Sequence, residues 1–202
     1  MNPLVSLAKL TVENYIREGK VITPFPDLPE EFLNKRAGTF VTIEKDGELR
    51  GCIGTYLPTR INIAQELIRN AIAAASEDYR FGPIKKEELP HLFYTVYILS
   101  YPEPVKDTKD LDPKKFGIIV KTGPFTFPNE VAELRSSPAL RYARAKEVVF
   151  NGVVPYKTGL LLPDLEGVDT VEQQISTACQ KGGIDPTQEK ILIYKFKVDK
   201  YE

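Results

Sequence analysis

The residues best suited to catalysis or ligand binding lie in one hexapeptide, LRGCIG, at residues 49–54. A thiolate is the nucleophilic form of cysteine, and a neighbouring cation favours it. Arg50 precedes Cys52 by two residues. Gly51 and Gly54 remove side chains near the thiol, so a ligand or another backbone can approach it closely. The pattern therefore makes Cys52 a candidate catalytic residue and Arg50, Gly51 and Gly54 candidate ligand-binding residues.

A packing interpretation of Cys52 stands beside the chemical one. Cysteine is among the most buried residue types and packs as a small hydrophobe. Ile53 beside it suits a core position, and Arg50 would then serve as a structural ion-pair partner. Because no histidine base stands near Cys52 in the sequence, packing is favoured over catalysis. Cys179, on the apolar side of an expected helix, is predicted to lie in the core.

A second stretch that could bind a ligand is EDYRF at residues 77–81, which interrupts a helical pattern. Loops between regular elements often carry function, which makes Asp78 and Arg80 candidate ligand-binding residues. The planar fork of Arg80 can clamp a carboxylate or a phosphate, so a small anionic ligand is one interpretation. The other is a local salt bridge, with Phe81 anchoring the loop in the core.

A basic segment carries the only pattern suited to nucleic acid, a helix-like run of cations around a tyrosine. Its members are Arg135, Arg141, Tyr142, Arg144 and Lys146. A solvated helix face is favoured instead, because the net charge of the chain is −1. His91, the one histidine, is interpreted as a surface or strand-edge residue.

Absent motifs narrow the remaining functions. The chain has no G-x-x-x-x-G-K-[ST], no G-x-G-x-x-G and no C-x-x-C, so no cofactor and no metal are predicted. No run of about 18 apolar residues is present, which predicts no membrane span. Two cysteines and the lack of an export signal favour a reducing cytoplasm.

The hexapeptide is expected on the second strand of a β-hairpin. Asp46-Gly47 is typical of a two-residue turn in which both residues have positive φ. Such a loop predicts three cross-strand pairs: Lys45 with Glu48, Ile43 with Arg50, and Val41 with Cys52. Arg50 and Cys52 would then share a face with Val41 and Ile43. A register change alters these pairs, and the glycines also permit a bulge that turns Cys52 outward.

Helices and further strands surround this hairpin. The spacing predicts helices from Pro3 to about Gly19, over 61–76 with an alanine-rich apolar stripe, and over 170–181. Strands are expected at these segments: 92–100, 116–122, 158–163 and 190–198. Because hairpins and single strands replace regular βαβ repeats, the fold class is α+β with a largely antiparallel or mixed sheet.

Several stretches together resemble the AMMECR family, named for the Alport syndrome, midface hypoplasia and elliptocytosis chromosomal region. They are LRGCIG, AAASEDYRFGPIKKEELPHLFYTVYILS, TGLLLPDLEG and VEQQISTACQKGGI, in that order. The resemblance spans about residues 3–198, so 1–202 is interpreted as a single AMMECR-type domain. Two departures stand out: an insert at about 124–157, and Asp164 where the family commonly has glutamine.

The resemblance implies two unequal lobes with largely antiparallel sheets, flanking helices and a cleft near LRGCIG. No settled activity accompanies it. Microbial relatives are encoded beside, or fused to, Memo-like metal-binding proteins and radical S-adenosylmethionine proteins, which makes these the expected partners. We therefore favour an adaptor or component of a modification pathway. An enzyme that uses Cys52 with Arg50 and Arg80 on a small anionic substrate is the alternative, and nucleic-acid binding ranks last.

Overall fold

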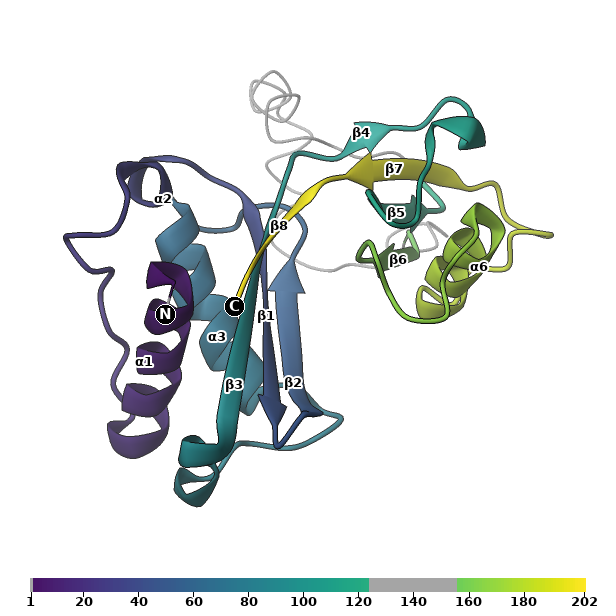
Figure 1. Cartoon of the computed structure of the whole chain (residues 1–202). Helices are drawn as coiled ribbons and strands as arrows, with labels where there is room; N and C mark the ends of the chain where they lie inside the picture. The colour runs from purple at the N-terminus through teal and green to yellow at the C-terminus, as the bar shows by residue number, and fades with distance from the viewer. Residues whose placement is uncertain (1, 124–155) are drawn as a thin grey trace, which may run out of the picture. The chain divides into compact units, whose positions relative to one another are not determined.

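The computed structural model describes residues 2–123 and 156–202, which form two compact units (Figure 1). Unit 1 comprises Met1–Tyr101 and Phe196–Glu202, and unit 2 comprises Pro102–Lys195. Each unit has its own four-stranded sheet with helices beside it, which confirms the predicted α+β class with antiparallel sheets. The basic segment around Tyr142 lies outside the described residues. No helix within the described ranges is both long and apolar enough to cross a membrane.

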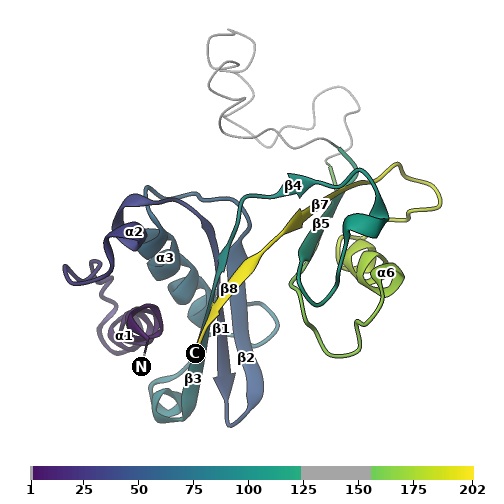
Figure 2. The same cartoon turned by 45° about the horizontal axis from the view of Figure 1, so that its top comes forward.

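Unit 1 is a sheet with helices packed on one face (Figure 2). Its strands are ordered β2-β1-β3-β8, with every neighbouring pair antiparallel, so β2 is an edge strand. The elements are α1 (Pro3–Glu18), α2 (Glu30–Asn34), β1 (Gly38–Lys45), β2 (Glu48–Thr55), α3 (Ile63–Ser76), the 3-10 helix η1 (Lys86–His91), β3 (Leu92–Leu99) and β8 (Val198–Tyr201).

Local sequence signals determine where the two long helices of unit 1 begin. The side chain of Asn2 accepts a hydrogen bond from the Leu4 amide at 2.9 Å, and α1 then starts at Pro3. Asn62 accepts from the Gln65 amide at 2.9 Å and caps α3 in the same way. The predicted apolar stripe of α3 is confirmed, since all its members are buried: Ala64, Leu67, Ile68, Ala71, Ala74 and Ala75.

The hairpin of β1 and β2 has the predicted turn but not the predicted register. Asp46 and Gly47 both have positive φ, at 54° and 86°, and Lys45 pairs with Glu48 as expected. Beyond the turn a register shift follows, so that Ile43 faces Gly51. The predicted pairs of Ile43 with Arg50 and of Val41 with Cys52 are therefore wrong.

A β-bulge at Arg50 is the physical reason for this difference. It inserts one extra residue into β2, and the residues beyond it exchange faces. Cys52 consequently lies opposite Thr42, and both are half-buried. Val41 and Ile43 are fully buried beneath the helices on the other face. The expected shared face is wrong, and the bulge anticipated as the alternative is present.

Gly51 is the point where the backbone of α3 lies directly on β2. A Cβ atom at this position would lie 2.2 Å from the carbonyl oxygen of Ala74. No real Cβ contact is this short, so only glycine permits the helix to pack at this depth. The group that approaches closely at Gly51 is thus the backbone of α3.

Unit 2 repeats this packing device in a smaller sheet ordered β4-β7-β5-β6. A Cβ on Gly159 would lie 1.8 Å from the Ala178 carbonyl oxygen, so α6 rests on β6 through a glycine. The described elements are β4 (Glu103–Pro104), the 3-10 helix η2 (Thr108–Asp110), β5 (Gly117–Lys121), β6 (Thr158–Leu161), α6 (Val171–Lys181) and β7 (Leu192–Phe196). The strand expected over 190–198 is therefore two strands, β7 in this sheet and β8 in the sheet of unit 1.

Cys179 lies in the core of unit 2, as predicted from its place on the apolar side of α6. It is 2% exposed and belongs to the cluster that contains Ile118, Val120 and Leu161. Burial raises the pKa of its thiol.

We expect Gly51→Ala to destabilise the chain by about 1–3 kcal/mol, because the added methyl group must displace the backbone of α3. Urea unfolding followed by circular dichroism measures this change. Leu49→Ala is the control, since Leu49 lies on the same strand and is 43% exposed. Equal stability of the two variants would contradict the close approach of α3 to β2.

Candidate functional site

The thiol of Cys52 lies on the face of the unit 1 sheet opposite to α1 and α3. Its Sγ accepts a hydrogen bond from Thr42 Oγ1 at 3.3 Å. The hydroxyl of Thr42 is also bonded to that of Tyr97 on β3, and burial raises the pKa of Tyr97. The thiol is therefore joined to a chain of two hydroxyls, which can orient it but do not act as a strong base at neutral pH.

Arg50 does not lie over the thiol. Its guanidinium forms a two-pronged pair with Glu88, Nε to Oε1 at 2.8 Å and Nη2 to Oε2 at 3.1 Å. The same group donates to the carbonyl oxygens of Gly82 and Pro83, at 3.1 and 3.3 Å. The hydrogen bonds from Arg50 to Glu88 are the main cause that lowers the pKa of Glu88 to about 2. Arg50 thus fastens the segment before η1 to β2, in the ion-pair role that was the alternative to ligand binding.

Asp78 and Arg80 meet Cys52 at its backbone. The carboxylate of Asp78 is 3% exposed and accepts the Cys52 amide hydrogen at an N–O distance of 2.9 Å. Arg80 donates Nε and Nη2 to that carboxylate at 2.9 and 2.7 Å, and its Nη2 also lies 3.5 Å from the Cys52 carbonyl oxygen. Because β2 is an edge strand, this ion pair takes the place of a neighbouring strand at Cys52.

The charges of this pair stabilise each other. Hydrogen bonds from Arg80 are the main cause that lowers the pKa of Asp78 to about 2. Hydrogen bonding to Asp78 raises the pKa of Arg80, and the neighbouring Cys52 contributes in the same direction. The local salt bridge is therefore present. The expectation that Phe81 anchors this loop in the core is wrong, since Phe81 is 38% exposed and lies under the Arg80 guanidinium at 5.1 Å.

The structure brings together three of the predicted site residues, Cys52, Asp78 and Arg80, and turns Arg50 elsewhere. A Cβ at Gly54 would lie 2.2 Å from the ring of Phe40, so this glycine makes room for an aromatic side chain.

His91 is exposed at the hairpin turn, 3.4 Å from Asp46. Asp46 is in the hairpin turn, four residues or about 13 Å along β1 from Thr42, the partner of Cys52, so His91 is not a base for the thiol.

A buried polar cluster on α3 was not predicted. Glu66 is fully buried and accepts hydrogen bonds from Thr55 Oγ1 at 2.7 Å and from the amides of Thr59 and Arg60 at 2.6 Å. Asn70, one helical turn later, donates to the Thr39 carbonyl at 2.9 Å. The cluster fastens the end of β2 to the helix. Its signal in the sequence is two polar residues four positions apart inside the apolar stripe.

The described residues form no cluster of metal ligands. Within residues 2–123 and 156–202, no group of three or more His, Cys, Asp or Glu side chains is placed to hold a metal ion.

Comparison with known proteins identifies relatives across nearly the whole chain. A family model described as AMMECR1 matches residues 5–201. A protein from Thermotoga maritima is 45% identical over 202 residues, which cover 100% of this chain and 98% of the relative. A protein from Clostridium acetobutylicum, CA_C1420, is 38% identical over 202 residues, but this chain spans only 36% of its length.

A solved structure has the same fold. The crystal structure of uncharacterized protein PH0010 from Pyrococcus horikoshii superposes with a TM-score of 0.74 at 28% sequence identity. The match covers 98% of this chain and 88% of that one.

We expect Asp78→Asn to lower the free energy of unfolding by about 2 kcal/mol at pH 7. The pKa of Asp78 falls from its ordinary value of 3.8 to about 2 on folding. The stabilisation is therefore present above pH 4 and is lost as the pH falls towards 2. Urea unfolding between pH 7 and pH 2 should show the two proteins converging at the acid end.

The control for this experiment is Asp46→Asn, because the Asp46 side chain is 65% exposed and its ion-pair partner, His91, lies 3.4 Å away. That variant should stay within about 0.5 kcal/mol of the parent at pH 7. A stability difference for Asp78→Asn that does not change with pH would refute the assigned role of the ion pair.

The two thiols should differ in native reactivity because Cys52 is half-buried and Cys179 is fully buried. We expect iodoacetamide to label Cys52 in the folded chain and Cys179 only after unfolding in urea, as measured by peptide mass spectrometry. Cys52→Ser should abolish native labelling and Cys179→Ser should not. Native labelling of Cys179, or none at Cys52, would contradict the placement of the thiols.

Proposed function

This chain belongs to the AMMECR1 family, and we propose that it acts as a partner-binding component of a modification pathway through the face of unit 1 that carries Cys52. One observation supports this choice above all. Arg50 of the hexapeptide and Arg80, which contacts its backbone, already pair with carboxylates of the same unit, Arg50 with Glu88 and Arg80 with Asp78. A thiol that has neither a base nor an unpaired cation beside it suits recognition better than substrate activation.

The proposed recognition surface, called here the Cys52 face, follows from the strand register. Thr42 on β1 pairs with Cys52 on β2 and with Thr95 on β3. Phe93 and Tyr97, two residues before and after Thr95 on β3, point to the same face. Its members are Phe40, Thr42, Cys52, Phe93, Thr95 and Tyr97, and the charged residues Glu44 and Lys200 lie at its margin, opposite Phe93 and Tyr97. Phe93 is 66% exposed. Aromatic rings with hydroxyl groups between them are typical of protein interfaces, where rings contribute area and hydroxyls contribute specificity.

The partners we propose are a Memo-like metal-binding protein and a radical S-adenosylmethionine protein, in the cytoplasm. The metal and radical chemistry would then belong to the partners. The Clostridium acetobutylicum relative supports a component role, because it contains a domain of this type within a chain almost three times as long. A component that acts in a larger assembly is often joined covalently to another member of it.

A second function, nucleophilic chemistry by Cys52 on a small anionic substrate, is favoured by one observation. The side chain of Arg80 is 44% exposed and lies beside Cys52, so an anion can still reach part of its guanidinium. One variant distinguishes the two functions. Cys52→Ser removes a nucleophile but changes the shape of a binding face only slightly.

We expect the full chain to bind a Memo-like or a radical S-adenosylmethionine protein encoded in the same genome, as measured by isothermal titration calorimetry. Phe93→Ala should weaken this binding at least tenfold, because a large exposed ring at an interface is a typical hot spot. Ile61→Ala is the matched control, since Ile61 is 71% exposed and lies outside the Cys52 face.

Absence of binding to both protein classes would refute the proposed partners. Binding that Phe93→Ala leaves unchanged would refute the proposed face. Full pathway activity of Cys52→Ser would exclude the nucleophilic alternative, while its complete loss with unchanged partner affinity would favour that alternative.

A further inference from the structure

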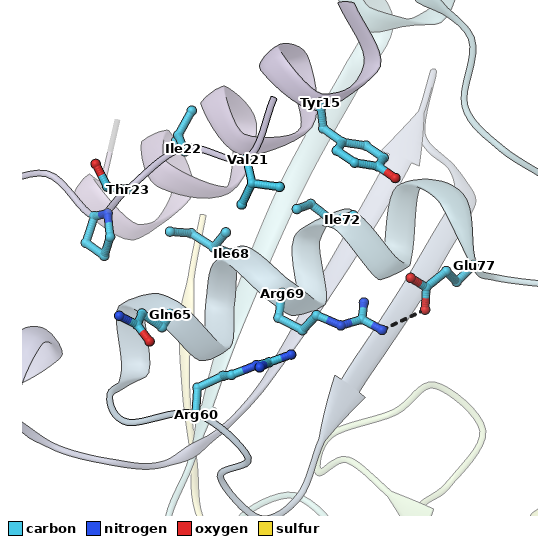
Figure 3. Close-up of a pocket in the computed structure, with 11 residues that line it drawn as sticks. Tyr15, Val21, Ile22, Thr23, Arg60, Gln65, Ile68, Arg69, Ile72 and Glu77 are labelled. Carbon is cyan, nitrogen blue, oxygen red and sulfur yellow. Dashed lines mark hydrogen bonds and ion pairs between the residues drawn. The ribbon is translucent and has the colours of Figure 1, made fainter. Parts of the chain in front are cut away.

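Unit 1 has a concavity on its helical side. A pocket of about 590 Å³ lies between α1, residues 21–24 and α3 (Figure 3). This volume is within the range of small-molecule binding sites, about 300–1,000 Å³. Its residues all belong to unit 1 and none of them belongs to the Cys52 face. The pocket is therefore independent of the function proposed above.

The walls of this pocket are mainly hydrocarbon. Ile68 and Ile72 of α3 form one wall, and Val21 and Ile22 form the opposite one. Val21 is 63% exposed in spite of its apolar side chain. An apolar ligand body that filled the space would cover this surface.

The charge of the pocket is positive. Arg60 and Arg69 both line it, and Glu77 is the one carboxylate among its lining residues. Glu77 Oε2 accepts from Arg69 Nη2 at 2.9 Å and compensates one of the two cations. In Figure 3, the Arg60 and Arg69 side chains extend towards the end of the pocket where Glu77 lies. One positive charge is thus left without a counter-ion in the pocket.

The hydrogen-bonding capacity of both arginines is incompletely used. Nη1 of Arg69 is buried and has no hydrogen-bond partner among the described residues. A buried donor without a partner is costly, and a guanidinium has five donors to satisfy. The main chain of Arg60 is held by Glu66 and Arg36, whereas its guanidinium makes no hydrogen bond to any described residue. The guanidinium of Arg60 therefore retains all its donors, and Arg69 retains one buried donor without an acceptor.

We propose that this pocket binds a small organic carboxylate. Its two oxygens would accept hydrogen bonds from the guanidinium groups of Arg60 and Arg69, and its hydrocarbon body would pack between α3 and residues 21–24. A planar carboxylate matches the fork of arginine, and its single charge equals the uncompensated charge of the pocket. The apolar walls favour it over a phosphate ester, whose second charge would have no partner.

Isothermal titration calorimetry of the full chain with octanoate and 3-phenylpropanoate tests this proposal. We expect dissociation constants below about 1 mM. Octanamide, which has the same body without the charge, should bind at least tenfold more weakly than octanoate. Hexyl phosphate should also bind more weakly. Equal binding of octanamide, or tighter binding of hexyl phosphate, would overturn the choice of a carboxylate.

Two variants locate the site. Arg60→Gln and Arg69→Gln should each weaken octanoate binding about tenfold, the value of a charge-assisted hydrogen bond. Arg17→Gln, an exposed arginine of α1 outside the pocket, is the matched control and should change nothing. Unchanged binding in both pocket variants would overturn the proposal. Because Arg69→Gln also removes the pair with Glu77, Arg69→Lys serves as a second variant that retains the charge but not the fork, and it should bind octanoate more tightly than Arg69→Gln and more weakly than the parent.

Discussion

The close contact between Gly51 and the carbonyl group of Ala74 determines how the rest of unit 1 is assembled. It brings the backbone of α3 onto β2 at a depth that any side chain at position 51 would prevent. The alanine-rich stripe of α3 has the same effect along the rest of the helix, because small side chains let a helix approach a sheet closely. The chain that leaves α3 therefore emerges beside the edge of β2, where Asp78 reaches the Cys52 amide.

Two ion pairs then complete the edge of β2. Asp78 with Arg80 and Arg50 with Glu88 each join a carboxylate to a guanidinium by two hydrogen bonds, and both carboxylates have a pKa of about 2. Each pair also bonds to backbone groups that would otherwise be exposed at an edge strand. The residues that seem most reactive in the sequence are thus occupied with holding β2 and the following segment together. This arrangement leaves the thiol half-buried, with the Thr42 hydroxyl as its hydrogen-bond donor, and it is the basis on which we propose recognition over nucleophilic chemistry.

The same packing device recurs in unit 2, where Gly159 lies against the carbonyl oxygen of Ala178. In both units a glycine on a strand accepts the backbone of an amphipathic helix, and a cysteine is nearby. The outcome differs because Cys52 is on the strand and turns away from the helix, whereas Cys179 is on the helix and faces the sheet. The Cys52 side chain is therefore half-buried, whereas that of Cys179 is fully buried.

The sequence by itself determined the elements of the fold, because their signals are local. The Asn2 and Asn62 caps, the Asp46-Gly47 turn and the apolar stripe of α3 depend on residues a few positions apart. The family resemblance likewise came from short stretches in order. Of the candidate site, the sequence identified Cys52, Asp78 and Arg80 but not how they meet. Only the tertiary structure decided that, because one bulged residue at position 50 reverses every side chain beyond it, and no local pattern specifies such a bulge. The partner of Arg50 is 38 residues away and the donors to Glu66 come from another element, so these contacts exist only once α3 has packed on the sheet.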